Sequence, residues 1–223
     1  VWAGVRREAF TRTATGVILA LFDFDGTITT REMMPDFVRM AVPRARLRLW
    51  GTLLAPWVFG YEAGWVSGSS IRSKIARAGF RGMPEADYRA AGERFARDVL
   101  PRVLRLEAMA RIAWHKARGD TVVVVSGGFD VYLSHWCRAQ GVDLLCSKLE
   151  VVDGVLTGRF DGAQCVREEK ARRVRERYVL RDFSAVHAYG DTAEDAELLA
   201  LADESWFRVW PDSVDTHLRD ERG

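Results

Sequence analysis

LFDFDGTITT, residues 21–30, begins as an apolar run and then places two carboxylates, Asp23 and Asp25, one residue apart and directly before a glycine. Like charges this close raise each other's pKa or require a nearby cation. A buried strand that ends on two such charges therefore indicates a binding or catalytic site at its carboxyl end. Taken alone, the Asp-Gly-Thr segment is equally typical of a turn followed by a helix N-cap.

Short, continuous apolar runs recur at residues 17–22, 121–125, 184–189 and 205–209. Their length and composition are typical of strands that are covered on both faces. Amphipathic stretches at 104–116 and 131–140 predict helices between them, the second with Gly141 as its C-cap. The alternation of strands and helices indicates an α/β fold, in which helices cover both sides of a parallel sheet.

The segment between the first two predicted strands is far longer than a crossover between parallel strands needs. Residues 31–106 are rich in helix-forming residues and contain no clear strand, which predicts an inserted cap of several helices. The expected division is a core of residues 1–30 and 107–223 and a helical cap of residues 31–106. The segment LEVVDGVLTGRF, residues 149–160, predicts a β-hairpin that turns at its Asp-Gly pair.

The predicted cap contains the apolar segment LRLWGTLLAPWVFGYEAGW, residues 47–65. Arg48 and Pro56 interrupt it, so no span of about 20 apolar residues remains for a transmembrane helix. We expect the segment to pack inside the cap or between copies of the chain rather than on a membrane, with Arg44, Arg46 and Arg48 on a solvated helix face. Its aromatic residues would also suit an apolar substrate pocket: Trp50, Trp57, Phe59, Tyr61 and Trp65.

Charge and cysteine content point to an ordinary cytoplasmic protein. The chain has 33 Lys and Arg against 31 Asp and Glu, and its net charge of +2 creates no overall field that would attract nucleic acid. The cysteines Cys137, Cys146 and Cys165 show no metal-ligand spacing, and nothing at the start resembles a signal peptide. We read the polar residues 1–16 as a lead-in to the first strand.

Acidic residues follow two of the predicted strands, at the sheet edge where α/β proteins bind their ligands. The first strand delivers Asp23 and Asp25, and the strand at 184–189 delivers Asp191, with Asp195 four residues later. Asp191 and Asp195 would share one helix face, where a solvated surface pair is the common alternative. Brought beside Asp23, they would form an oxygen-rich site suited to Mg²⁺.

The segment VVVVSGGF, residues 122–129, places a hydroxyl and two glycine amides at the start of a helix. Ser126, Gly127 and Gly128 are therefore candidates for binding phosphate oxygens, although a plain strand-to-helix turn uses the same residues. Lys170, within CVREEKARRV, is typical of a surface lysine when it is considered alone. It becomes a candidate for the same site only in combination with the other clusters.

Four segments in this order resemble the motifs of the haloacid dehalogenase-like phosphatases: FDFDGT, VVVVSGGF, the lysine of REEKARRV, and YGDTAEDAELL. The resemblance extends from residue 17 to about residue 212. It is closest to the phosphoserine phosphatase-like branch, subfamily IB, which is similar in the VSGGF segment, the DGVLTGRF hairpin and the position of the cap. It implies a Rossmann-like core and the hydrolysis of phosphate monoesters.

The resemblance also implies roles for the acidic residues. Asp23 would be the nucleophile that becomes an aspartyl-phosphate. Asp25 would protonate the leaving oxygen and then deprotonate the attacking water. Mg²⁺ would be held by Asp23, the main-chain carbonyl of Asp25 and Asp191, while Asp195 would hold Asp191 or a metal-bound water.

The remaining roles concern the phosphoryl group and the substrate. Ser126, the glycine amides and Lys170 would grip the phosphoryl group, and Thr27 would steady the loop and its phosphate contact. Glu32 has the spacing of a glutamate that binds the substrate amine in phosphoserine phosphatases, but an exposed helix-start glutamate is an equal alternative. The residue that meets the substrate carboxylate is left open among Arg72, Lys74 and Arg77.

These features together predict a Mg²⁺-dependent phosphomonoester hydrolase that acts on a small phosphorylated metabolite, with O-phosphoserine as the leading candidate. A phosphatase for an apolar or lipid phosphate is the first alternative, because the cap is rich in aromatic residues. A non-catalytic, phosphate-accepting signalling module is the second. Such a module would need neither the long cap nor the second acidic residue at position 25.

Overall fold

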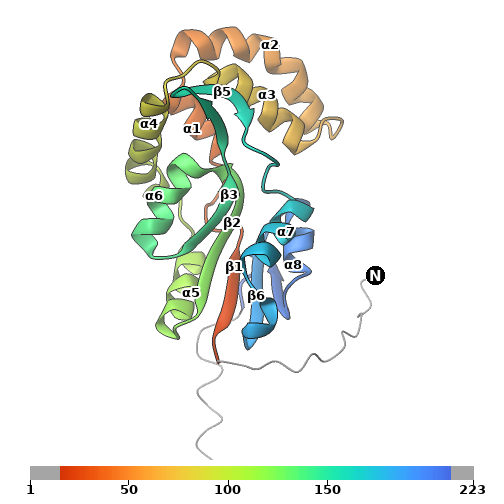
Figure 1. The fold of residues 1–223 in the computed structure, drawn as a ribbon. Coiled ribbons are helices and arrows are strands. Elements are labelled where there is room, and N and C mark those ends of the chain that lie inside the picture. Colours follow the sequence, from red (N-terminus) through yellow and green to blue (C-terminus); the bar gives the residue numbers. More distant parts are fainter. Residues whose placement is uncertain (1–15, 212–223) are drawn as a thin grey trace, which may run out of the picture.

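A five-stranded parallel sheet forms the centre of the computed structural model, which describes residues 16–211 (Figure 1). In spatial order its strands are β3 (Asp143–Ser147), β2 (Thr121–Phe129), β1 (Ile18–Phe22), β6 (Ala185–Gly190) and β7 (Glu204–Phe207). Strand β1 pairs with β2 and β6 and is buried at every position, which explains its unbroken apolar sequence. The predicted α/β fold is confirmed, while nearly all of the expected lead-in, residues 1–16, lies outside the described residues.

Two helices cover each face of this sheet. They are α5 (Leu106–Ala117), α6 (Asp130–Gln140), α7 (Glu168–Arg177) and α8 (Ala196–Leu199), with short 3₁₀ turns at Leu100–Arg102, Leu180–Asp182 and Ala193–Asp195. Helices α5 and α6 pack with Ala20 and Phe22 of β1, whereas α7 and α8 pack with Leu19 and Leu21 on the opposite face. Gly141 ends α6 with a φ of 63°, as the sequence predicted.

The two edge strands differ from the sequence prediction. Strand β3 was not predicted, because it pairs with β2 alone, is only partly buried and contains just a short apolar run. At the other edge, β7 ends at Phe207, earlier than the expected strand at 205–209. Arg208 has a φ of 59°, which an extended strand does not allow.

Four of the helices that come between β1 and β2 in the chain lie above the carboxyl end of the sheet (Figure 1). They are α1 (Met34–Ala41), α2 (Arg44–Glu62), α3 (Gly68–Phe80) and α4 (Glu85–Asp98). The predicted hairpin is present as β4 (Leu149–Val152) and β5 (Val155–Phe160). Strand β5 lies against α3, so closely that a Cβ on Gly158 would be 2.9 Å from the Cα of Arg77.

One hydrophobic core joins the cap helices to the sheet. Phe37 of α1 has ring contacts with Phe80 of α3 and Phe95 of α4. It also contacts Phe129 at the end of β2 and Tyr132 of α6, with ring centroids 6.0 Å and 5.1 Å away. This cluster packs the cap helices against β2 and α6 in one continuous core. The packing therefore marks no boundary between the two units, and the expected division stays a prediction.

The apolar segment of residues 47–65 is not buried inside the cap. Leu49, Leu53 and Phe59 are 59%, 55% and 62% exposed. The expectation of internal packing was therefore wrong for these side chains, because α2 packs on α3 and its outer side faces solvent (Figure 1). Among residues 16–211, no helix combines the length and the apolar character needed to cross a membrane.

A buried chain of hydrogen bonds connects α5 to strands β1 and β6. The Asp120 carboxylate accepts from the Ile18 backbone N–H at 2.9 Å and lies 2.8 Å from His115 Nδ1. His115 Nε2 lies 3.1 Å from the Tyr189 hydroxyl, to which Arg111 donates at 2.6 Å. A neutral imidazole that donates from Nδ1 to Asp120 and accepts at Nε2 satisfies every contact. Burial lowers the pKa of His115 to about 4, although Asp120 opposes this shift.

We predict that protonation of His115 contributes to acid unfolding. The pKa of His115 is about 4 in the folded chain and takes its usual value of 6.5 in the unfolded chain. Its contribution to the free energy of unfolding is therefore complete above about pH 6.5 and is lost as the pH falls toward 4. The shift corresponds to about 3 kcal/mol at most. Urea titrations should show a smaller loss of unfolding free energy between about pH 7 and about pH 4.5 in His115→Gln than in the parent chain or in His135→Gln. Equal losses in all three would contradict this role.

Candidate active site

The loop after β1 is fixed by backbone hydrogen bonds and by Arg105. The N–H groups of Ile28 and Thr29 donate to the Phe24 carbonyl at 2.9 and 3.0 Å. Arg105 Nε lies 3.0 Å from the Gly26 carbonyl oxygen and 3.1 Å from that of Thr29. These contacts determine where the two carboxylates of the opening motif point. Arg105 was missed in the sequence, where nothing distinguishes it from other arginines near helix ends.

Asp23 and Asp195 share the charge of Lys170. Lys170 Nζ lies 2.5 Å from Asp23 Oδ1 and 2.6 Å from Asp195 Oδ1, and all three side chains are buried. Burial raises the pKa of Asp23 well above its usual range, although Lys170 opposes the shift. Burial would also raise the pKa of Asp195, but Lys170 and two backbone N–H groups lower it overall. One lysine cannot balance the charge of two carboxylates, and a further cation would stabilise the remaining negative charge.

The acidic residues predicted to bind a metal come together at this edge of the sheet. Asp23, Asp191 and Asp195 each offer a carboxylate oxygen within 4.8 Å of the others. Thr27 donates from Oγ1 to Asp191 Oδ1 at 2.9 Å, so Thr27 orients one of the three. A group of carboxylate oxygens is the donor set that Mg²⁺ prefers, and these residues therefore fit the expected ion.

The carboxylate of Asp25 faces the cavity rather than this acidic group. Its Oδ1 accepts from the Met33 backbone N–H at 3.0 Å. Burial raises the pKa of Asp25 to about 7, although the Met33 hydrogen bond opposes the shift. A carboxyl group that exchanges its proton near neutral pH is suited to acid and base catalysis. The contact of its main-chain carbonyl with Mg²⁺ remains a prediction.

Three of the predicted phosphate-binding residues, Ser126, Gly127 and Gly128, lie at the carboxyl end of β2 and line the same cavity, whereas Thr27 is not among the residues that line it. The Gly128 N–H donates to Ser126 Oγ at 3.0 Å, which leaves the hydroxyl proton of this buried serine able to donate to a ligand. Gly127 packs closely on the chain before α7, where a Cβ would lie 2.8 Å from Val166 Cγ1. The glycines therefore allow the backbone to approach the cavity without a side chain in the way.

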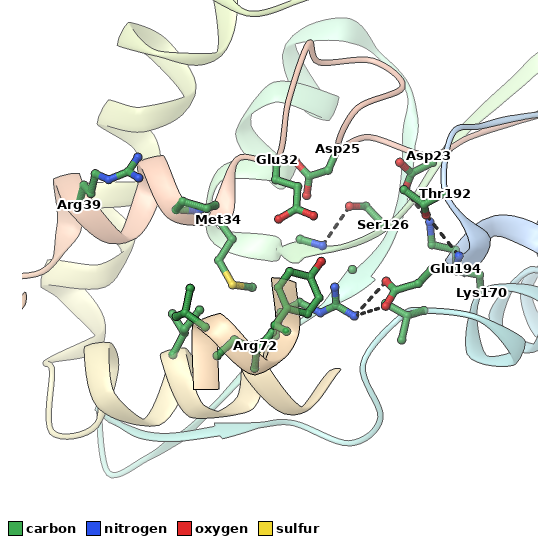
Figure 2. Close-up of a pocket in the computed structure, with 18 residues that line it drawn as sticks. Asp23, Asp25, Glu32, Met34, Arg39, Arg72, Ser126, Lys170, Thr192 and Glu194 are labelled. Atoms are coloured by element: carbon green, nitrogen blue, oxygen red, sulfur yellow. Dashed lines mark hydrogen bonds and ion pairs between the residues drawn. The ribbon is translucent and has the colours of Figure 1, made fainter. Parts of the chain in front are cut away.

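A cavity of about 440 Å³ separates these groups from the cap (Figure 2). Its walls on the cap side include Glu32, Met34, Arg39, Val58, Tyr61, Ile71, Arg72 and Ile75. Of the three candidates for a substrate carboxylate, only Arg72 lies on this wall. Lys74 instead lies over the Trp57 ring, 3.6 Å from its centre, and Arg77 lies beside the hairpin.

Arg72 is already paired with residues of the core (Figure 2). Its Nη2 lies 2.8 Å and 2.9 Å from the two carboxylate oxygens of Glu194, and its Nε donates to Gln164 Oε1 at 3.0 Å. The pair links α3 to the turn between Asp191 and Asp195. Glu194 and Gln164 were missed in the sequence analysis, although the position of Glu194 between two predicted metal ligands was a usable signal.

The profile of the haloacid dehalogenase-like hydrolases matches residues 20–200. This range includes the end of β1, all four cap helices and every acidic residue of the site. The chain therefore belongs to the haloacid dehalogenase-like hydrolases, and the resemblance noted in its motifs is confirmed.

Relatives and structural neighbours place the chain near the phosphoserine phosphatases. Protein CicA of Caulobacter vibrioides (strain NA1000 / CB15N) is 35% identical over 203 residues, 86% of each chain. Phosphoserine phosphatase SerB2 of Mycobacterium tuberculosis is 32% identical over 176 residues, 65% of this chain and 42% of SerB2. A phosphoserine phosphatase solved as a phospho-aspartyl intermediate analogue has a TM-score of 0.62 at 24% identity, with 86% of each chain covered. A Bordetella pertussis Tohama I protein of unknown function has a TM-score of 0.71 at 25% identity, over 86% of this chain and 89% of that one. The enzyme is thus a phosphatase of the phosphoserine phosphatase-like kind.

We predict that Gly26→Ala reduces kcat at least about tenfold, because a Cβ at this position would lie 2.3 Å from Asp191 Oδ2 and displace that carboxylate. Gly82→Ala is a matched control. Gly26 and Gly82 have φ values of 83° and 80°, but no atom lies within 4 Å of a Cβ on Gly82. Phosphate release by Gly82→Ala should stay within about twofold of the parent, since it has only backbone strain of about 1 kcal/mol. Equal losses of kcat in the two variants would show that backbone strain alone is responsible.

Proposed function

We propose that the chain is a Mg²⁺-dependent phosphomonoester hydrolase that works through an aspartyl-phosphate on Asp23. The observation that carries this proposal is the position of the Asp23 carboxylate. It lines the cavity, contacts Lys170 and belongs to the oxygen cluster with Asp191 and Asp195. A carboxylate nucleophile needs access to its substrate, a fixed orientation and compensation of its charge, and Asp23 has all three.

The reaction has two displacement steps at phosphorus. An oxygen of Asp23 attacks the phosphorus atom, the bond to the ester oxygen breaks, and Asp25 gives its proton to the leaving alcohol. Asp25 is then ionised and takes a proton from a water molecule, whose oxygen attacks the phosphorus. The bond to Asp23 breaks, and inorganic phosphate and the original carboxylate are restored.

The groups around the phosphoryl position support both steps. The Ser126 hydroxyl, the Gly127 amide and the Lys170 ammonium would bind its equatorial oxygens, on which the charge is spread, and the Gly128 amide, which donates to Ser126 Oγ, would orient that hydroxyl. Their positions along the cavity wall support these roles. Such donors act in the transition state without reorganisation, because their own packing already holds them in place.

The acidic cluster supports the binding of Mg²⁺. Asp23, Asp191 and the main-chain carbonyl of Asp25 would hold the ion, which when bound supplies positive charge beside the transferring phosphoryl group. Asp195 Oδ2 accepts from the backbone N–H groups of Asp191 and Thr192 at 3.1 and 2.9 Å. Asp195 thereby fixes the backbone that carries Asp191. In the absence of the ion, the enzyme should lose its turnover.

Asp23→Asn should reduce phosphate release from p-nitrophenyl phosphate by at least about a thousandfold, because the amide is not a nucleophile. The assay measures inorganic phosphate with Mg²⁺ present and again after chelation, which should inactivate the parent enzyme. Asp98→Asn, at an exposed position on α4, is the control and should behave as the parent. An Asp23→Asn variant that turns over at the parental rate would refute the assignment of the nucleophile.

We propose a small phosphorylated metabolite as substrate, with O-phosphoserine as the leading candidate. The phosphoserine phosphatases among the relatives support this choice. Glu32 and Arg72 place opposite charges on the cap wall of the cavity, as the amine and carboxylate of an amino acid would require. A substrate carboxylate would have to share Arg72 with Glu194 or displace it.

An apolar or lipid phosphate is a second candidate. The cap wall also presents the apolar side chains of Met34, Val58, Ile71 and Ile75, which would bury a hydrocarbon group attached to the phosphate. The third possibility from the sequence, a non-catalytic phosphate-accepting module, has lost its support because the chain belongs to a family of hydrolases.

We also propose a cytoplasmic location. The three cysteines, Cys137, Cys146 and Cys165, are free and buried. Unpaired cysteines are typical of proteins in reducing compartments.

Glu32→Ala should raise the KM for O-phosphoserine by about tenfold or more, because a charge-assisted hydrogen bond to the amine would be lost. The KM for p-nitrophenyl phosphate, which has no amine, should stay within about twofold. Lys74→Ala, which removes a cap charge outside the cavity, is the control for a general effect of charge. Equal increases for both substrates in Glu32→Ala would count against an amine contact.

A further inference from the structure

Helix α2 exposes apolar side chains along its outer side. Leu49, Leu53 and Trp57 are spaced four residues apart and so follow one line along the helix. Each is at least 44% exposed, and we call these three residues the α2 stripe. Phe59 and the 80% exposed Trp65, whose rings are in contact, extend the apolar surface beyond the end of the helix. An exposed apolar surface of this kind marks an interaction site.

The same part of the chain has a strong positive charge. Residues 44–81, which form α2, α3 and their connection, contain seven arginines and lysines but one acidic residue, Glu62. Their formal net charge is +6, or +5 when Arg72, which is paired with Glu194 in the cavity wall, is left out, whereas the whole chain has a net charge of +2. The balanced composition of the protein therefore conceals a cationic cap surface, which attracts anionic partners locally.

Specific contacts hold the charges and the stripe together. Arg46 donates to the carbonyl oxygens of Ala78 and Arg81 at 2.7 and 2.6 Å, which fixes the start of α2 to the end of α3. The Lys74 ammonium lies 3.6 Å from the centre of the Trp57 ring. Cationic and aromatic groups thus lie side by side on one preformed surface.

We propose that the α2 stripe and its neighbouring cations dock on the surface of an anionic lipid bilayer. Helices that lie in a membrane interface place aliphatic and tryptophan side chains at the hydrocarbon boundary and direct arginine and lysine toward anionic headgroups. The α2 surface combines these elements. The proposal replaces the expectation from the sequence that this segment avoids membranes.

Charge favours a lipid surface over a second copy of the chain. A symmetric dimer formed through α2 would pair this surface with itself. Arg44, Arg48 and Lys74 would then lie near the same cations of the second copy across a desolvated contact. An anionic bilayer instead offers charges of opposite sign over the whole surface.

Docking through α2 would also orient the cavity. Val58 and Tyr61 of this helix line the cavity wall, so docking would bring this wall of the cavity close to the lipid headgroups. A phosphate ester with an apolar tail would reach the site from that surface. The docking itself rests on α2 and α3 and does not depend on the proposed chemistry.

Sedimentation of the full chain with lipid vesicles tests the proposal. The chain should bind vesicles that contain phosphatidylglycerol, bind vesicles of phosphatidylcholine alone at least about tenfold more weakly, and release from the former as salt is raised. Leu49→Ser/Leu53→Ser and Arg44→Glu/Arg48→Glu should each weaken binding at least about tenfold. Neither pair lines the cavity, so hydrolysis of p-nitrophenyl phosphate without vesicles should be unchanged and would show that the variants are folded.

Two substitutions at exposed positions away from α2 and α3 are matched controls: Leu106→Ser on α5 and Arg175→Glu on α7. Both should bind vesicles as the parent does. The proposal is overturned if the parent does not sediment with anionic vesicles, if both vesicle types bind it equally, or if the α2 variants bind normally. It is also overturned if the parent is a dimer without lipid and the α2 variants are monomers. Because sedimentation requires no turnover, an inactive enzyme would leave this test intact.

Discussion

Lys170 is the fixed positive charge on which the acidic site depends. Asp23 and Asp195 come from separate parts of the chain, and both are buried. Without a cation between them, mutual repulsion and the loss of hydration would both disfavour the ionised carboxylates. Helix α7 holds Lys170 in this place because Ala171 and Val174, on the same helix, pack into the core beneath the sheet. The electrostatics of the site therefore rest on the hydrophobic packing of one short helix.

The remaining polar groups of the site are arranged around this charge by the sheet and the cap. Parallel strands bring their carboxyl ends to one edge, where Asp23 and Asp191 follow β1 and β6 and Ser126 lies near the end of β2. The cap closes the space above them and contributes Glu32 and Arg72. The core thus supplies the residues for catalysis and the cap supplies the residues for substrate selection, and both sets line one cavity.

Much of this arrangement was predictable from the sequence, because it follows from local patterns and from one rule of topology. The apolar run of β1 and the Asp-Gly turn of the hairpin have local signals, and parallel strands bring their ends together. The pairing of Arg72 with Glu194 was not predictable, since it depends on how α3 rests on the core over a separation of 122 residues. The exposure of the apolar side chains of α2 was also missed. An apolar composition predicts burial, but it does not show whether another part of the chain packs over the helix.

The aromatic cluster around Phe37 attaches some of the cap helices to the sheet through apolar rings, while others are attached through polar groups. Moving α1 or α4 would pull Phe37 or Phe95 away from the core and expose large apolar rings to water. Helix α2 and the first turns of α3 lie outside this cluster, and polar contacts join the α3 turns to the core. Arg72 pairs with Glu194, and Gln164 binds Arg72, the Ser69 carbonyl and the Ser73 hydroxyl. The two attachments therefore differ in their response to ionic strength, which screens the ion pair but leaves the packing of the rings almost unchanged.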